Sequence, residues 1–352
     1  MSKNALDLDP AALTHRPLPA FAASGAVLAM AALAVLAATA GFSDYLLTLL
    51  AILFINIALA VSLNITNGLT GLFSLGHPAF MTIGAYVAAI LTYPASRKAF
   101  MLPDLPAFLA DTQFTLLPAV IMAGLVAGIM GFLVGLPVLR LRGHYLAVAT
   151  LGLIVIVQGL ATNWSGLTRG GSGLNGIPRL TGIWWSFGIM ALAIIVTWRI
   201  KFSSLGRAMM ATRENALAAE CAGVNTFRIR MFAFVAGAVL AAMAGALMAH
   251  LISVVTPKTY SISLAFNLVV MVVIGGSGSI SGAILAAVGI TVLSEAVRPM
   301  EEAIGLYGLS QVIVALALIL VLFFRPQGLF GSGEPELVRK IFAGRLKHGR
   351  ST

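Results

Sequence analysis

Long apolar runs follow one another along most of this chain, and each is close in length to a membrane-spanning helix. About 20 residues of helix cross the hydrocarbon core of a bilayer. On that basis the pattern predicts about ten spans, of which the third and the eighth are short. We expect them at residues 21–41, 45–65, 78–94, 115–138, 144–162, 182–198, 230–252, 262–276, 279–297 and 308–324. The predicted fold class is therefore all-α, a polytopic membrane protein.

The first apolar run has a second interpretation, a cleaved signal peptide, because the small residues at 37–40 are typical of a cleavage site. The run is longer than the roughly 7–15 apolar residues of a usual signal-peptide core. The residues before it include Asp7 and Asp9 and are not a short basic segment. We therefore favour a retained span.

Two polar, glycine-rich stretches break the apolar pattern, at residues 64–78 and 275–282. Non-helical backbone at membrane depth must face protein or a water-filled cavity, and broken segments often mark a transport path. The first break is expected to line such a path, because asparagine, serine and histidine cluster in it. For the second, close helix packing through small residues is an equally good interpretation. The candidate path residues are Asn64, Asn67, Ser74, His77, Gly275, Ser277 and Ser279.

A third glycine-rich stretch, at residues 167–178, could be taken for a phosphate-binding loop. Such a loop needs the pattern GxxxxGK[ST], because its lysine neutralises phosphate and its hydroxyl holds magnesium. That pattern occurs nowhere in the sequence. Tight turns and contact with an extracytoplasmic partner remain the two interpretations of this stretch.

Composition indicates that lipid is the main solvent of the chain. Hydrophobic residues make up 59% of the 352 residues and charged residues only 10%, whereas a soluble domain carries roughly 25% charged residues. The net charge of +10 does not indicate a nucleic-acid partner, because the basic residues lie in short loops between apolar runs. The single cysteine, Cys221, excludes a disulfide within the chain and a CxxC metal or redox site.

The distribution of lysine and arginine predicts the orientation of the chain. With the N-terminus in the cytoplasm, sixteen of the 22 basic residues fall in cytoplasmic segments, which is the positive-inside pattern. Both termini are then cytoplasmic. The expected organisation is a cytoplasmic tail at 1–19, a transmembrane domain at 20–331 and a basic cytoplasmic tail at 332–352.

A charged island at residues 198–230 lies between two spans on the predicted cytoplasmic side. Ser203 or Ser204 is a suitable N-cap and Gly223 a suitable C-terminal stop, so we expect one amphipathic helix with 206–223 as its working part. Helical periodicity predicts an apolar stripe formed by Met210, Leu217 and Cys221. The charged flanks of this stripe are Arg207, Arg213, Glu214 and Glu220. The opposite face is small and consists of Ala208, Thr212, Asn215, Ala219 and Ala222. Such a helix can press its small face on a membrane bundle and offer its stripe to a soluble partner. The alternative is a helix that lies on lipid, which the acidic residues disfavour.

No catalytic, cofactor or metal site is indicated by the sequence, because HExxH, GxSxG and carboxylate pairs at catalytic spacing do not occur. An ion-coupled carrier usually keeps a carboxylate or histidine inside the membrane. The nearest candidates, Glu295 and His250, fall near the ends of predicted spans. A stand-alone ion-coupled carrier and a polytopic membrane enzyme are therefore the weaker interpretations. If the chain transports actively, we expect its energy to come from another subunit.

Several stretches together carry a family resemblance. Residues 217–223 align with the EAA-x3-G coupling motif of ABC-importer permeases, with Leu217 in place of its glutamate. The others are SLGH at 74–77, GAY at 84–86, LRLRGHYLA at 139–147, GGS at 170–172, GIP at 176–178, SLGRA at 204–208 and FRPQGLFG at 324–331. On these stretches the chain resembles the LivM-type permeases of the branched-chain (hydrophobic) amino acid ABC importer family, over about residues 45–331. His144 stands where an acidic residue is usual, and both tails lie outside the match.

The resemblance implies a non-enzymatic, multi-pass permease subunit that forms half of a translocation pore in the bacterial inner membrane. It also implies a second, LivH-type permease, two cytoplasmic subunits that bind ATP and Mg²⁺, and a periplasmic substrate-binding protein. Relatives carry branched-chain amino acids, urea, short amides or aromatic acids, so the substrate stays open. Residues 199–229 would be the coupling loop, which contacts the ATP-binding subunits through Gly206, Arg207, Met210, Arg213, Glu214, Leu217, Glu220, Cys221 and Gly223.

Overall fold

The computed structural model describes residues 43–102, 105–141, 143–305 and 308–331, together with Gly41, Gly333 and Glu334. Phe42–Gly333 forms one compact unit. The predicted span at 21–41, apart from Gly41, and nearly all of the two predicted tails lie outside the described residues.

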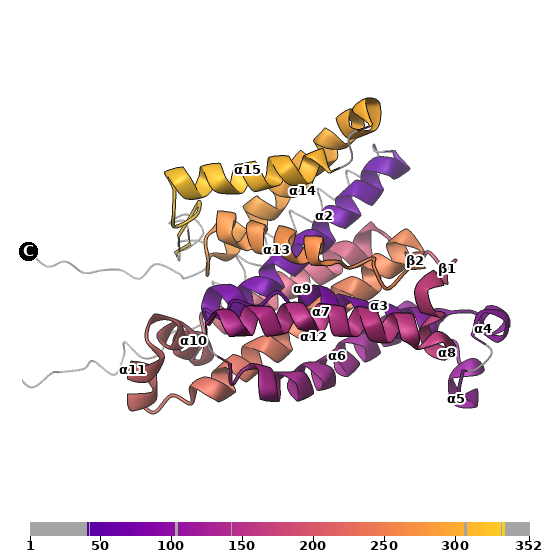
Figure 1. Cartoon of the computed structure of the whole chain (residues 1–352), viewed down its shortest axis with the longest axis horizontal. Helices are drawn as coiled ribbons and strands as arrows, with labels where there is room; N and C mark the ends of the chain where they lie inside the picture. Colours follow the sequence, from indigo (N-terminus) through magenta and orange to yellow (C-terminus); the bar gives the residue numbers. More distant parts are fainter. Residues whose placement is uncertain are drawn as a thin grey trace, which may run out of the picture. The chain divides into compact units, whose positions relative to one another are not determined.

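Nine helices fall on the nine predicted spans that the structure describes (Figure 1). They are α2 (Asp44–Leu63), α3 (His77–Thr92), α6 (Leu116–Val138), α7 (His144–Asn163), α9 (Ile183–Lys201), α12 (Thr226–Ile252), α13 (Ile262–Gly275), α14 (Ile280–Ile304) and α15 (Leu309–Phe324). In the described part, six helices are long and apolar enough to cross a membrane, or seven if α3 and the sharply bent α4 (Ala95–Met101) form one span. Helices α13 and α15 are shorter. The all-α polytopic fold is confirmed there, and the count of about ten stays a prediction.

Helix α12 is the centre of the bundle and packs against α2, α3 and α6. Two glycines allow its close approach to α3. A Cβ atom on Gly84 would overlap the backbone of Ala242, and one on Gly245 would come within 2.5 Å of the Met81 carbonyl. Small residues let helix backbones approach inside a membrane, where packing drives association.

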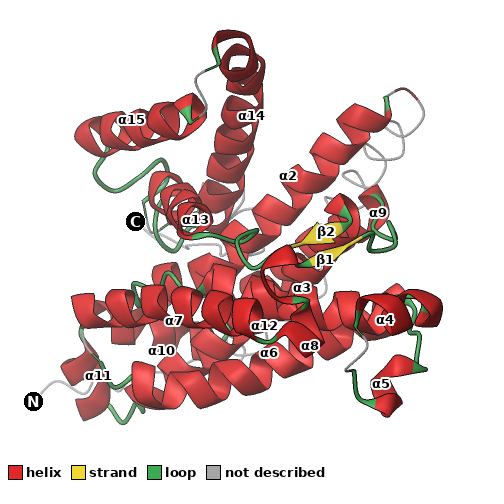
Figure 2. Cartoon of the chain, turned by 45° about the vertical axis from the view of Figure 1, so that its right-hand side comes forward, coloured by secondary structure: helices red, strands yellow, loops and turns green. Residues whose placement is uncertain are grey.

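Short elements lie at the two opposite ends of the bundle (Figures 1 and 2). One end, the sheet end, holds α4, α5 (Ala107–Ala110), α8 (Ser165–Thr168), the 3₁₀ turn η3 (Gly170–Ser172) and the strands β1 (Leu174–Asn175) and β2 (Val254–Val255). The two strands are antiparallel, with Leu174 opposite Val255. The other end, the island end, holds α10 (Ser204–Glu214) and α11 (Ala216–Cys221).

The glycine-rich loop at 167–178 lies at the sheet end and is built from tight turns. Gly170, Gly173 and Gly176 have φ values of 60°, 64° and 73°, a region that other residues avoid. A Cβ atom on Gly173 would also overlap the carbonyl oxygen of Val255 in β2. Backbone conformation and close approach to β2 therefore account for these glycines.

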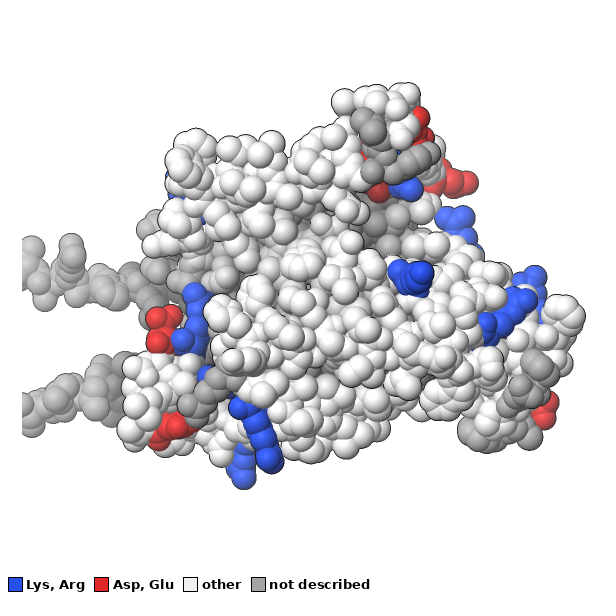
Figure 3. All heavy atoms as spheres, in the orientation of Figure 1, with Lys and Arg blue, Asp and Glu red and all other residues white. Residues whose placement is uncertain are grey.

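The surface between the two ends is almost uncharged. On the face seen in Figure 3, lysine, arginine and acidic side chains gather mainly toward the two ends of the bundle. Large apolar side chains between the two ends are exposed, among them Leu125 at 56%, Ile156 at 60% and Leu316 at 54% exposure. Apolar surface of this extent indicates a lipid environment rather than water.

Candidate functional site

The two predicted breaks meet at the island end of the bundle. In the first, α2 continues as a short π-helix, η2 (Asn64–Leu69), and irregular chain then leads to α3. The second is the turn between α13 and α14. We call the region where η2, the α13–α14 turn and α10 come together the junction. The junction places the two breaks in direct contact.

Asn64 fastens η2 to the α13–α14 turn. Its side-chain nitrogen donates to the Ser279 carbonyl and its side-chain oxygen accepts from the Gly278 N–H, both at 2.9 Å. Gly68 lies against the same contact and leaves room for it. A Cβ atom at this position would overlap Oδ1 of Asn64 and come within 2.5 Å of the Gly278 nitrogen. Asn64 is fully buried, so losing either bond would leave a polar group unpaired away from water.

Two basic side chains bring the charged island into the junction. Nη1 of Arg213 in α10 donates to the Gly68 carbonyl at 2.7 Å and to the Ser277 carbonyl at 2.9 Å. Nζ of Lys201, the last residue of α9, is buried and donates to the Gly278 carbonyl at 2.6 Å. Carbonyls at helix ends and turns lack an intrahelical partner, and a cation satisfies them with a charge-assisted bond. Helices α9 and α10 therefore both bind the backbone of the breaks.

The irregular half of the first break is held by side chains that bond to backbone. The side chain of Asn67 donates to the Ser74 carbonyl and accepts from the Ser74 N–H, both at 3.1 Å. The Leu75 N–H donates to Oγ1 of Thr150 in α7 at 3.0 Å. His77 begins α3 and is buried, and its Nε2 has no hydrogen-bond partner among the described residues. The candidate path residues thus lie together, but here they pack against protein.

The second break is closed by glycines and by the last described segment of the chain. A Cβ atom on Gly275 or on Gly282 would overlap the backbone of the other. The Leu329 N–H donates to the Ile274 carbonyl at 2.8 Å, so residues 325–331 cover the turn. Sequence reasoning assigned no place to this segment. The available signal was its glycines, since Gly328 has a φ of 76° and a Cβ atom there would clash with the second break.

The prediction of one continuous helix in the island is wrong. The structure has two short helices, α10 and α11, separated at Asn215, whose φ of −155° and ψ of 104° are extended. The Asn215 side chain accepts from the Ala218 N–H and caps α11, because a short amide competes with the helical backbone for its N–H groups. Ser203 is the N-cap of α10, and Gly223 follows α11 with a φ of 83°, in the places that the sequence predicts.

The break at Asn215 changes which island residues share a surface. The expected stripe is divided, with Met210 half-buried on α10 and with Leu217, at 71% exposure, and Cys221 open on α11. Of the expected small face, Thr212 and Ala219 are buried, whereas Asn215 and Ala222 are exposed.

The charged flanks of the island also separate. Arg207 and Glu214 are exposed, and Gly206 is buried where α10 begins, so close to α9 that a Cβ atom would overlap its last carbonyls. Arg213 turns inward to the junction. Glu220 accepts from Oγ1 of Thr226 at 2.5 Å, which ties α11 to the start of α12. Of the residues predicted to contact the ATP-binding subunits, Arg207, Glu214, Leu217, Glu220, Cys221 and Gly223 are exposed, whereas Gly206 is buried and Met210 and Arg213 are half-buried.

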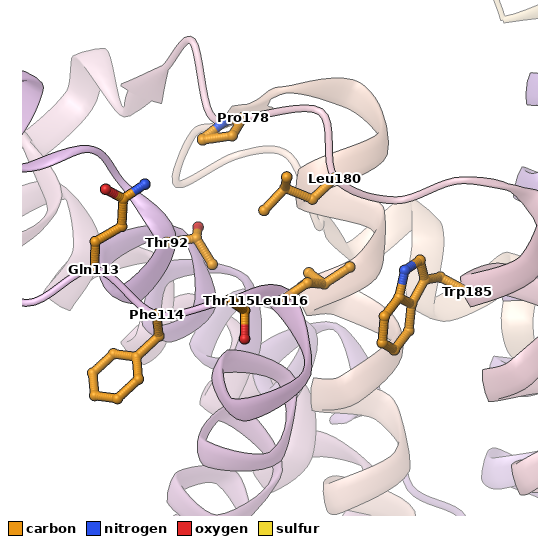
Figure 4. A pocket seen from close by; sticks show the side chains of 8 residues that line it. All are labelled: Thr92, Gln113, Phe114, Thr115, Leu116, Pro178, Leu180 and Trp185. Carbon is orange, nitrogen blue, oxygen red and sulfur yellow. The ribbon is translucent and has the colours of Figure 1, made fainter.

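A cavity of about 400 Å³ lies at the opposite, sheet end (Figure 4). Its lining comes from the end of α3, the loop before α6 with its first residue, and the loop before α9 with its first turn. It consists of Thr92, Gln113, Phe114, Thr115, Leu116, Pro178, Leu180 and Trp185. None of the candidate path residues belongs to it. In the part of the chain that the structure describes, no group of histidine, cysteine and acidic side chains could hold a metal ion.

Comparison with known proteins identifies the family. Residues 44–323 match the family described as "Branched-chain amino acid transport system / permease component". The chain is 32% identical to the high-affinity branched-chain amino acid transport system permease protein LivM of Salmonella typhimurium, over 83% of this chain and 71% of that protein. The equivalent LivM of Escherichia coli (strain K12) is also 32% identical, over the same shares.

A second kind of permease is similar as well. The high-affinity branched-chain amino acid transport system permease protein LivH of Salmonella typhimurium is 27% identical, over 80% of this chain and 92% of that protein. No solved structure matches this chain. The apolar helices and the similarity to transport permeases both indicate a multi-pass membrane protein that takes part in transport. The chain therefore belongs to the family of permease components of branched-chain amino acid transport systems.

Proposed function

We propose that this chain is one of two homologous permease subunits of an ABC importer. It forms half of a translocation pore in the bacterial inner membrane, and ATP hydrolysis on two cytoplasmic subunits drives it. The observation that carries this proposal is the exposed surface of α10 and α11 on a largely uncharged bundle. The chain has no ATP-binding loop of its own, so a surface that receives force from an ATP-binding partner explains the island.

The proposed orientation has the island end in the cytoplasm and the sheet end in the periplasm. The excess of basic residues in the segments on the island side supports this choice. The lengths of the apolar runs support about ten spans, and an even number of spans would put both termini in the cytoplasm. The sheet end then meets the periplasmic substrate-binding protein, and Arg97, Arg179 and Lys258 are exposed there for acidic groups on that partner.

The proposed substrates are branched-chain amino acids, because the relatives that cover most of this chain carry that name. A second candidate is a different small molecule, such as urea, a short amide or an aromatic acid. The autoinducer 2 import system permease LsrC of Yersinia pseudotuberculosis supports keeping this alternative, since it is 31% identical over 50% of this chain.

The junction is proposed to close the cytoplasmic end of the path. Its residues are buried or half-buried and are joined by hydrogen bonds, which is the expected arrangement of a closed gate. When the two breaks separate, the candidate path residues, including Asn64, Ser74 and His77, would face water. Cysteines placed at these positions should react with water-soluble thiol reagents in at least one state of the transport cycle.

The proposed function is tested with the assembled importer in proteoliposomes. The chain should co-purify with an ATP-binding subunit and with a second permease, and uptake of radiolabelled leucine should require ATP and the binding protein. Excess urea or phenylalanine serves as competitor and separates the two substrate proposals. Uptake by this chain alone, without ATP, would instead establish a stand-alone carrier.

A further inference from the structure

We infer that Arg213 is the positioning residue through which movement of α10 reaches both breaks of the junction. This inference rests on the proposed function, because it assumes that a partner moves α10. The guanidinium lies between two chain segments far apart in the sequence, 145 residues from Gly68 and 64 from Ser277, and donates to both carbonyls.

Three glycines form the slot that holds the Arg213 side chain. Gly68 supplies one of the two acceptor carbonyls. A Cβ atom on Gly71 would lie 2.9 Å from Cγ of Arg213, and one on Gly278 would lie 2.9 Å from Nη1. Gly71 and Gly278 also have φ values of 68° and 93°, so both conformation and space require glycine there. The slot therefore has room for the aliphatic part and the guanidinium of Arg213, and residues of both breaks form it.

The hydrogen bonds that Asn64 and Lys201 make in the junction do not involve α10. Asn64 binds one break to the other, and Lys201 belongs to α9. Among the described residues of α10, Arg213 alone has a side chain with a recorded hydrogen bond to either break. A displacement of α10 would pull on the Gly68 and Ser277 carbonyls together or release them together. Arg213 thus links the docking surface mechanically to the gate.

The exposed face of the same two helices is free for the partner. Leu217 and Cys221 are exposed on α11, and Arg207 and Glu214 are exposed on α10. Removal of the Arg213 guanidinium should therefore leave docking and ATP hydrolysis in place while the gate no longer responds. Lysine keeps a charge but lacks the planar fork of arginine, so it should restore part of the coupling.

The first test measures ATP hydrolysis and uptake separately in the assembled importer. For Arg213→Gln we expect ATP hydrolysis within about 2-fold of the wild type and leucine uptake at least about 10-fold lower. Arg213→Lys should fall between the two. Arg140→Gln is the matched control, since Arg140 is exposed in the loop before α7, and it should behave as the wild type. Unchanged uptake in Arg213→Gln, or an equal loss of hydrolysis and uptake, would overturn the inference.

The second test needs neither ATP nor partners and therefore separates this inference from the proposed function. Cys221 is the single cysteine of the chain. The double variant Cys221→Ser, Ser277→Cys therefore carries one thiol, which lies in the junction, and it is labelled in the membrane. Adding Arg213→Gln should increase the rate of labelling by a water-soluble maleimide about 10-fold, and Arg213→Lys should increase it less. Equal rates in all three would refute the Arg213 contact, even in an importer that transports normally. An importer without ATP-dependent uptake, but with these labelling rates, would refute the proposed function and leave the contact intact.

Discussion

The island end and the sheet end of the bundle are held together by different combinations of hydrogen bonds. At the island end, buried or half-buried side chains reach across 64 to 215 residues of sequence to bind backbone groups in the junction. At the sheet end, backbone-to-backbone bonds of a two-stranded sheet stand beside side-chain bonds such as that from Arg97 to the Gly176 carbonyl. Leu174 pairs with Val255, and the N–H groups of Gly176 and Ile177 both donate to the Ser253 carbonyl, at 3.0 and 3.1 Å.

The difference has a consequence for how each end responds to change. Backbone-to-backbone bonds survive most side-chain substitutions, whereas the junction depends on a few side chains and on glycines that leave them room. Buried polar networks are stable when every member is satisfied and costly when one is missing. Under the proposed function, an end built in this way would suit a gate with a closed and an open state. The sheet end is instead suited to hold a fixed shape around its cavity.

The largest effect is expected at Gly68, where the junction leaves no space. In Gly68→Ala the new methyl group would overlap Oδ1 of Asn64, so η2 and the α13–α14 turn must separate. Overpacking of this kind typically costs about 1–3 kcal/mol, and loss of the Asn64 bonds adds to it. We expect a clearly lower thermal midpoint in detergent and no uptake. Gly152→Ala in α7 is the control, because nothing lies within 4 Å of the added Cβ, and its midpoint should stay or rise slightly.

The next effect in size is expected at Asn64. Asn64→Leu keeps the number and branching of the side-chain heavy atoms but removes both hydrogen bonds. The buried Gly278 N–H then loses its acceptor, while the Ser279 carbonyl keeps only its bond from the Ala283 N–H. A buried group left unpaired costs about 1–3 kcal/mol. The free energy of unfolding, measured by denaturation in mixed micelles, should fall accordingly. Asn163→Leu at the end of α7 removes an exposed bond to the Gly159 carbonyl and should change it far less. Equal losses in the two variants would contradict the described difference between the ends.

The sequence predicts the positions of the helices well and the junction poorly. A membrane span is a local property, since apolar run length alone decides it, and the expected spans at 45–65 and 115–138 lie on α2 and α6 within two residues or so at most ends. The junction is a long-range property. No local pattern states that Asn64 binds Gly278, 214 residues away, or that Arg213 binds Gly68.

The island shows where local reasoning went wrong. The periodicity of the apolar residues predicts one helix through Asn215, although asparagine is a good N-cap and a poor interior helix residue. The helix therefore ends and restarts, and Arg213 faces the bundle rather than a partner. Composition still indicated the two breaks, because asparagine, serine and glycine do not belong on a lipid-facing helix. It could not show that they bind each other.

A smaller effect, limited to partner binding, is expected from the exposed ridge of α11. Leu217 is 71% exposed, so Leu217→Asp should leave the thermal midpoint of the chain unchanged. Under the proposed function it should weaken binding of the ATP-binding subunit about 10-fold, as loss of an apolar anchor does at an interface. Trp164→Ala is the control at the sheet end, where Trp164 is 59% exposed. Co-purification yields decide the matter, and a loss with Trp164→Ala but not with Leu217→Asp would reverse the proposed orientation.

The smallest effect is expected at Arg97, which is the sheet-end counterpart of Arg213. Both arginines donate through Nη1 to a glycine carbonyl at 2.7 Å, Arg97 to Gly176 and Arg213 to Gly68. The Arg97 bond is exposed, so water replaces it when the side chain is removed, and Arg97→Ala should cost under about 1 kcal/mol of unfolding free energy. Arg213→Ala leaves the Gly68 and Ser277 carbonyls without their partner in a part-buried site, and should cost more. Paired denaturation curves of the two variants measure the difference directly. Since the bond length and the chemical groups are the same, a larger loss at Arg97 would show that burial is not what distinguishes the two ends.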